Sequence, residues 1–332
     1  MCWVAVTDAC SRHRASTSDV REFVGNRLAS SRWELADETR HRGQWRRALG
    51  VPVRVGQGSI VYDVTRFRGG DGRFRWRHRI KGTGREQSTH INGLIPLGDD
   101  TLVVGSMLDA DGADFLVTRL AKSGGRERWR ARLRGPKGNF YPSHNQGFSV
   151  ATDVTGDVLV TGVVQNMSDE GGNYGDVIVA KLDGSTGSEQ WRSAPSVGGY
   201  LVAGDRSSDV IAAGTSASGT SVAKLSGTDG KLLWRRDLED VWRTSALSTD
   251  AEGDVFLASS AFEADDRGDD FCITKLAGGT GEILWIDRES ASSDRWEEAT
   301  QVIVDPSGAV SLRGWWTTER GARGRWMVRC SR

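Results

Sequence analysis

One pattern of apolar and polar residues recurs along the chain: an apolar run, a short turn rich in Gly, and a second run that carries a Trp. The best preserved copy is AKLDGSTGSEQW, which ends at Trp191. In at least five copies a Gly stands four residues before the Trp. The repeat consists of Trp76, Trp129, Trp191, Trp234, Trp285, Gly72, Gly125, Gly187, Gly230 and Gly281. Two apolar runs around a turn of Gly, Asp, Ser and Thr are typical of a β-hairpin. The fixed turn brings each Trp to an equivalent position, so we expect its ring to be buried between neighbouring units.

A second pair of strands precedes each hairpin. Residues 149–152 lead through the turn DVTGD into VLVTG at 158–162, and related turns occur at 205–209, 250–254 and 305–308. Each unit therefore contains four strands, a to d, which in the best copy span about 147–152, 157–162, 176–182 and 188–192. Consecutive repeat Trp residues are 43 to 62 residues apart. Four short antiparallel strands at this period predict a β-propeller blade.

The number of blades follows from the c-strands. Six are visible, at 60–67, 115–120, 177–182, 221–225, 271–276 and 326–330, and the chain ends just after the sixth. We therefore expect an all-β propeller of six four-stranded blades, with the missing last d-strand supplied by the N-terminal segment. Trp33 fits that closing strand and Trp45 fits the first a-strand better. A seven-bladed or truncated propeller is the alternative.

The first 30 residues are predicted to be a leader or a short helix over 18–30, and residues 31–332 a single propeller domain. The apolar run at the N-terminus is too short for a signal peptide or a membrane span. A late start that leaves a lipoprotein cleavage remnant at Ala9 and Cys10 is a weaker alternative.

The charge balance and the cysteine count indicate which classes of binding partner and metal site the sequence does not predict. Lys plus Arg and Asp plus Glu number 44 each, and Arg is scattered along the sequence, so bulk charge predicts neither nucleic-acid binding nor membrane binding. The four cysteines, Cys2, Cys10, Cys272 and Cys330, have neither zinc-site spacing nor the density of a disulfide scaffold. Cys272 and Cys330 are expected to be small buried apolar residues on c-strands. We expect a monomer without a metal or a cofactor.

The residues Asp183, Thr186, Gly187 and Trp191 resemble the docking motif of PQQ-like β-propeller repeats, and the Asp-x-x-Gly-Asp turns resemble SBBP-type bacterial propeller repeats. The resemblance covers about residues 51–330, although Ala121, Ser226 and Ala277 replace Asp183 in other copies. It implies an extracytoplasmic protein, whether secreted, periplasmic or lipid-anchored. The calcium and quinone ligands, adjacent cysteines and eight blades of quinoprotein dehydrogenases are not recognisable, nor are GxSxG, HExxH or P-loop motifs. A non-catalytic binding or scaffold module is therefore predicted, with a quinone-dependent or carbohydrate-active enzyme as the alternative.

The connections between b and c strands and between d and a strands vary most in length and emerge on one face of a propeller, here called the loop face. This face is where contacts with a protein, peptide or carbohydrate are expected. The candidate ligand-binding residues are Tyr141, His144, Trp242, Trp296 and Trp315. The alternatives are that His144 is simply exposed to solvent and that the Trp residues fill the space between blades.

Two acidic loops contain enough carboxylates to be considered as calcium-binding sites. They contain Asp109, Asp111 and Asp114 in the first loop and Glu263, Asp265, Asp266, Asp269 and Asp270 in the second. Neither matches a complete calcium-binding loop, so solvated carboxylates are favoured over a metal site.

Overall fold

The computed structural model describes fourteen segments of the chain. They are residues 40–41, 44–45, 47–55, 59–68, 71–82, 88–109, 112–135, 143–165, 175–239, 241–262, 269–289, 295–305, 308–318 and 323–330. Within them every regular element is a β-strand. The predicted leader or helix of residues 1–30 lies outside the described residues, as does Trp33. No helix in these segments is long and apolar enough to span a membrane.

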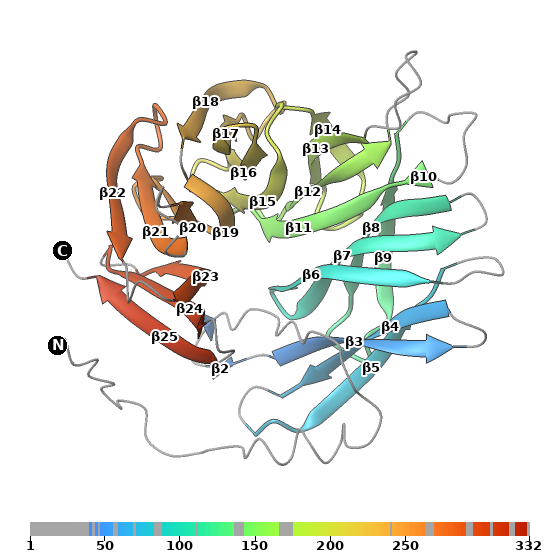
Figure 1. The fold of residues 1–332 in the computed structure, drawn as a ribbon. Helices are drawn as coiled ribbons and strands as arrows, with labels where there is room; N and C mark the ends of the chain where they lie inside the picture. The colour runs from blue at the N-terminus through green and yellow to red at the C-terminus, as the bar shows by residue number, and fades with distance from the viewer. Residues whose placement is uncertain are drawn as a thin grey trace.

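The strands form six successive antiparallel sheets that follow one another around a ring (Figure 1). The first sheet contains β3 (Arg47–Val55), β4 (Ser59–Phe67) and β5 (Phe74–Ile80). The second contains β6 (Thr89–Leu97), β7 (Asp100–Asp109), β8 (Gly112–Leu120) and β9 (Glu127–Leu133), with the short β10 (Ser143–His144) parallel to β8. The third contains β11 (Gln146–Thr152), β12 (Val158–Gln165), β13 (Gly175–Leu182) and β14 (Glu189–Ser193).

The fourth sheet contains β15 (Gly199–Gly204), β16 (Val210–Ser216), β17 (Gly219–Leu225) and β18 (Leu232–Glu239). The fifth contains β19 (Val241–Thr249), β20 (Val255–Phe262), β21 (Asp269–Leu276) and β22 (Ile283–Glu289), and the sixth contains β23 (Arg295–Val304), β24 (Val310–Thr318) and β25 (Arg323–Cys330). The a-strands β6, β11, β15, β19 and β23 surround the centre of the ring, and the d-strands form its outer edge (Figure 1). The all-β propeller predicted from the repeats is thus present.

The core lies between sheets rather than within them. Five clusters of buried apolar side chains each join two consecutive sheets, from the first and second to the fifth and sixth. The b and c strands supply most of these residues, because both of their faces are covered by neighbouring sheets. In β12 and β17, for example, almost every residue is buried. Sheets two to five are therefore each stabilised mainly by the sheet before and the sheet after them.

The two terminal sheets differ from the prediction of four strands per blade. The first consists of b, c and d strands and the last of a, b and c strands within the described residues. Trp45, expected in the first a-strand, instead lies in β2 (Gln44–Trp45), which pairs with β1 (Arg40–His41). The assignment of Trp45 to the first sheet is therefore wrong, because its strand finds a partner only a few residues away. The described pairings do not include the predicted closing strand beside β25.

Candidate functional site

Four of the repeat Trp residues dock on the sheet that follows their own. Trp191 is 8% exposed, and its indole Nε1 donates a hydrogen bond to the carbonyl oxygen of Gly227 at 3.1 Å. Its ring lies against Gly230, where a Cβ would stand 2.6 Å from the ring atom Cε3. The same arrangement joins Trp76 to Gly125, Trp129 to Gly187 and Trp234 to Gly281. In sheets two to five, the Gly four residues before the repeat Trp thus leaves space for the Trp of the preceding sheet.

A cation stands ten residues before each repeat Trp, and the sequence analysis did not single it out. These cations are Arg66, Lys181, Lys224 and Lys275, which are buried, and Arg119, which is partly buried. The Lys224 ammonium lies 2.7 Å from an oxygen of Asp205 and 3.4 Å from one of Asp209. It also donates to the carbonyl oxygen of Gly278, which accepts the indole N–H of Trp234 as well. A charged residue at a constant position inside an apolar strand is the signal that could have identified this contact.

The charges in these contacts stabilise one another. Burial raises the pKa of Asp153, but hydrogen bonds from Lys181, Thr155 and the Asp157 N–H outweigh it, so the pKa lies below its ordinary value. Burial lowers the pKa of Lys224, but Asp205 and Asp209 raise it by more. Asp153 and Lys224 therefore stay ionised near neutral pH and serve the architecture rather than proton transfer.

Three of the predicted ligand-binding residues lie in strands rather than in connections. Trp242 is in β19, because a single residue separates β18 from β19 and the strand begins almost at once. Trp296 is in β23 and Trp315 in β24, where the hairpin extends further toward the loop face than predicted. Trp296 pairs with Thr317, and Trp315 with Glu298. Positions 296 and 315 are therefore diagonal neighbours in one ladder, on the sheet next to that of Trp242.

His144 lies in another part of the ring, and Tyr141 lies outside the described residues. The backbone of His144 is in β10 and pairs with Ala113 at the start of β8. The next residue, Asn145, is buried; its amide group donates to the Ala113 carbonyl at 2.9 Å and accepts the Gln165 N–H at 2.7 Å. These two hydrogen bonds hold the connection that carries His144 against the second and third sheets. The structure does not bring His144 together with the three Trp residues.

In the first acidic loop, the Asp114 carboxylate forms ion pairs with two arginines. Asp114 is buried, and its oxygens lie 2.5 Å from Nε of Arg134 and 3.4 Å from Nη1 of Arg132. The expectation of a solvated carboxylate is therefore wrong for Asp114, because two guanidinium groups of β9 and its extension cover it. The Asp109 side chain, Asp111 and the side chains of the second acidic loop lie outside the described residues. Within the described part of the chain, no three His, Cys, Asp or Glu residues are grouped to hold a metal ion.

Cys272 is fully buried on β21, as the sequence predicts for a small apolar residue. Burial raises the pKa of its thiol, so it is not a thiolate nucleophile at neutral pH. The Cys330 side chain lies outside the described residues.

The inner strands carry a set of residues that the sequence analysis missed. In each a-strand a β-bulge interrupts the pairing with the b-strand. The bulge lies about five residues before the turn that joins the two strands. The residues at this position are Asn92, Phe148, Tyr200, Ser245 and Thr300. The rings of Phe148 and Tyr200 pack with their centroids 5.0 Å apart, and Tyr200 is 49% exposed. The Asn92 amide donates to the carbonyl oxygen of Gly147, beside the next bulge, at 2.6 Å.

The Phe148 and Tyr200 bulges lie near the beginnings of their strands, on the side of the loop face. They form an aromatic pair on two adjacent inner strands, in ring order between His144 and Trp242, in which Tyr200 is exposed and Phe148 is partly buried. Phe148 and Tyr200 each stand five residues before the first Asp of the next turn, Asp153 and Asp205. This constant spacing is the feature of the sequence that could have identified them.

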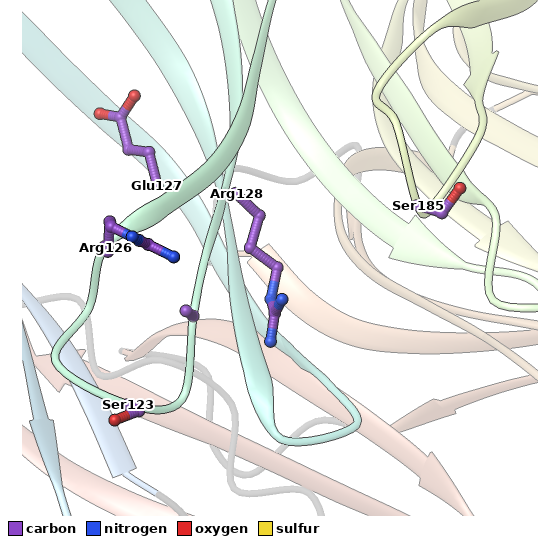
Figure 2. A pocket seen from close by; sticks show the side chains of 6 residues that line it. Ser123, Arg126, Glu127, Arg128 and Ser185 are labelled. Atoms are coloured by element: carbon purple, nitrogen blue, oxygen red, sulfur yellow. The ribbon is translucent and has the colours of Figure 1, made fainter.

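A groove of about 690 Å³ lies on the opposite, turn side of the ring, between the second and third sheets. Its lining residues are Ala121, Ser123, Arg126, Glu127, Arg128 and Ser185. Figure 2 shows the Arg126 and Arg128 side chains between the outer turn of the second sheet and Ser185 on the third, whereas Glu127 points away from them.

The guanidinium of Arg128 is held by Asp100, whose oxygen is 2.5 Å from Nε. Burial raises the pKa of Asp100, but the Lys122 N–H and the guanidinium groups of Arg119 and Arg128 lower it below its ordinary value. Asp100 therefore remains anionic and positions the arginines above it.

Comparison with known proteins agrees with this architecture. Residues 58–314 match a PQQ-repeat family model described as outer membrane protein assembly factor BamB. No curated protein sequence matches the chain. Two solved structures share the propeller fold at a TM-score of 0.50. One is the Dos1 propeller, 10% identical, over 83% of this chain and 67% of that one. The other is a quinohaemoprotein alcohol dehydrogenase from Comamonas testosteroni, 11% identical, over 81% of this chain and 58% of that one.

BamB from Moraxella catarrhalis is 17% identical, with a TM-score of 0.41, and the match covers 69% of this chain and 58% of the BamB chain. This chain thus matches less than two thirds of the length of that protein. The family match, by contrast, extends over most of the chain and over sheets one to six. The repeats named in the sequence as PQQ-like are confirmed by it, and the chain belongs to the β-propeller family described as outer membrane protein assembly factor BamB.

Proposed function

We propose that this protein is a non-catalytic binding or scaffold module that holds a protein or peptide at the loop face. The observation that carries the proposal is the aromatic pair of Phe148 and Tyr200 on two adjacent inner strands, with Tyr200 half exposed. Exposed aromatic rings on rigid strands supply a large contact area at a low cost in conformational entropy. Because a bulge residue is left out of the strand ladder, its side chain is free to face a ligand.

The contact surface that we propose extends from this pair to the residues first suggested by the sequence. Trp242 is half-buried on the neighbouring fifth sheet, and we include His144 of β10, Trp296 of β23 and Trp315 of β24 in the proposed surface. Tyr141, which lies outside the described residues, belongs to the same proposal from the sequence alone. The description of the family as an assembly factor supports a scaffold over an enzyme and an extracytoplasmic location over a cytoplasmic one. We expect the protein to act as a monomer, without a cofactor.

Peptide and glycan arrays probed with the full-length protein provide the test. Tyr200→Ala, Phe148→Ala and Trp242→Ala should each weaken binding to the ligands found by at least tenfold, or about 1.4 kcal/mol. Leu233→Ala is the matched control, since Leu233 is equally exposed but lies on the outer strand β18. Unchanged binding by the three folded variants would contradict the proposal. Reduction of a redox dye after addition of PQQ and calcium would instead support the alternative of a quinone-dependent enzyme.

We further propose that the ring has six blades and is closed by the N-terminal segment beside β25. Hydrogen exchange of the full-length protein tests this closure. In an edge strand about half of the amide groups lack a partner, whereas a strand paired on both sides protects nearly all of them. Slow exchange throughout residues 323–330 that is lost on deletion of residues 1–46 supports closure, and alternating fast exchange in the intact chain contradicts it.

A further inference from the structure

The outer strands of the first two sheets carry cations at every second position. They are Arg73, Arg75, Arg77, Arg79 and Lys81 on and around β5, and Arg126, Arg128, Arg130, Arg132 and Arg134 on and around β9. Residues 66–81 and 119–134 together contain fourteen Arg and Lys but only two acidic residues. Arginines that are scattered in the sequence are therefore gathered on one side of the ring. We call the two segments the basic rim.

The two halves of the basic rim are in direct contact. His78 Nε2 on β5 lies 3.1 Å from Glu127 Oε1 on β9, and Arg130 donates to the Lys81 carbonyl at 3.1 Å. The indole of Trp76 also donates to the Lys122 carbonyl at 2.8 Å. The groove lined by Arg126 and Arg128 continues this surface to the third sheet (Figure 2).

The positive charge of the rim faces outward. The carboxylates that balance part of it, Asp63, Asp100 and Asp114, are buried beneath the arginines. Arg75 and Arg126 are exposed, and neither forms an ion pair with another described residue. Although the chain as a whole is neutral, exposed cations therefore outnumber exposed carboxylates on these two segments.

The outer strand of the first sheet also carries an exposed aromatic side chain. Phe74 is 52% exposed and stands between Arg73 and Arg75, two residues before Trp76. The equivalent residue of the fourth sheet, Leu232, is 51% exposed, but it is followed by Arg235 and Asp237, which pair with each other. Cations on both sides of an exposed apolar residue thus distinguish the outer strand of the first sheet from that of the fourth.

We propose that the basic rim docks the protein on an anionic lipid surface, with the arginines on headgroup phosphates and Phe74 in the interface. The planar guanidinium groups bind phosphate oxygens in pairs, and basic residues near a membrane attract anionic lipids. An apolar ring beside them adds burial at the headgroup boundary. A single-stranded nucleic acid needs several rings for successive bases, and Trp76 and Trp129 of the same strands are buried, which favours the lipid surface.

The test is co-sedimentation of the full-length protein with vesicles of phosphatidylcholine alone or with 30% phosphatidylglycerol. Binding should require the anionic lipid and weaken steeply with salt. The double variant Arg75→Gln and Arg126→Gln should lose about 25-fold in affinity, at about fivefold for each arginine. Phe74→Ser should lose roughly tenfold.

The control variants remove exposed cations and an exposed apolar side chain from the fourth sheet instead. Arg206→Gln with Lys231→Gln, two exposed cations of the fourth sheet, and Leu232→Ser should leave vesicle binding unchanged. The proposal is overturned if anionic vesicles are not bound at low salt, or if the rim and control variants bind alike. Inorganic phosphate that competes at millimolar concentration would indicate a site for a free phosphate group rather than a surface. Tighter binding to single-stranded DNA than to vesicles would indicate a nucleic-acid site.

Discussion

The docking of Trp191 on Gly230 can be tested with a pair of glycines that differ only in what lies beside them. Gly230 and Gly72 occupy the same turn position in the fourth and first sheets, with φ angles of +71° and +68°. Alanine in this left-handed region costs about 1–2 kcal/mol at either site. At Gly230 the new Cβ would also stand 2.6 Å from Cε3 of Trp191, whereas at Gly72 no atom lies within 4 Å.

The buried ring of Trp191 must therefore move in Gly230→Ala, since the obstacle is a rigid ring rather than a flexible chain end. Overpacking of this kind costs about 1–3 kcal/mol, and loss of the indole hydrogen bond to Gly227 adds about 1 kcal/mol. We expect Gly230→Ala to be less stable than Gly72→Ala by about 2–4 kcal/mol. Urea denaturation followed by circular dichroism measures the difference, with the slope of each transition checked for constancy. Equal losses in the two variants would refute the docking argument.

Three further predictions follow from the contacts between sheets. Trp191→Ala should lower the free energy of unfolding by about 3–5 kcal/mol, and Trp285→Ala by less than half of that, because Trp285 is 37% exposed; urea midpoints distinguish them. Lys181→Ala should cost about 3–5 kcal/mol by leaving Asp153 unpaired, and an equal result for the exposed Lys231→Ala would contradict this. The folded-state pKa values of Asp100 and Asp153 lie below the ordinary value of 3.8, so the two ionised carboxylates stabilise the fold fully above that pH. This stabilisation is lost as the pH falls through the folded-state pKa values. Thermal melting measured between pH 5 and 2 should show the loss as a falling melting temperature.

Much of the architecture follows from local sequence. The Asp-x-x-Gly-Asp turns are predictable because Asp153 accepts the N–H groups of Thr155 and Asp157, only two and four residues ahead. Such hydrogen bonds are made whatever the rest of the chain does. The constant spacing of Gly and Trp likewise identifies the hairpin and, by its repetition, the propeller. Trp242 shows the limit of this reasoning, since its assignment to a connection depended on a strand boundary that local patterns place poorly.

The candidate sites depend on contacts between residues that the sequence separates. Phe148 and Tyr200 meet because two inner strands of adjacent sheets lie side by side, 52 positions apart in the chain. The arginines of β5 and β9 form one rim for the same reason, whereas composition alone shows a neutral chain. The hairpins, the turns and the propeller repeat can be predicted from local sequence, because they depend on contacts within a few residues. Which side chains share a surface depends on how successive sheets pack around the ring, and this is visible only in the folded chain.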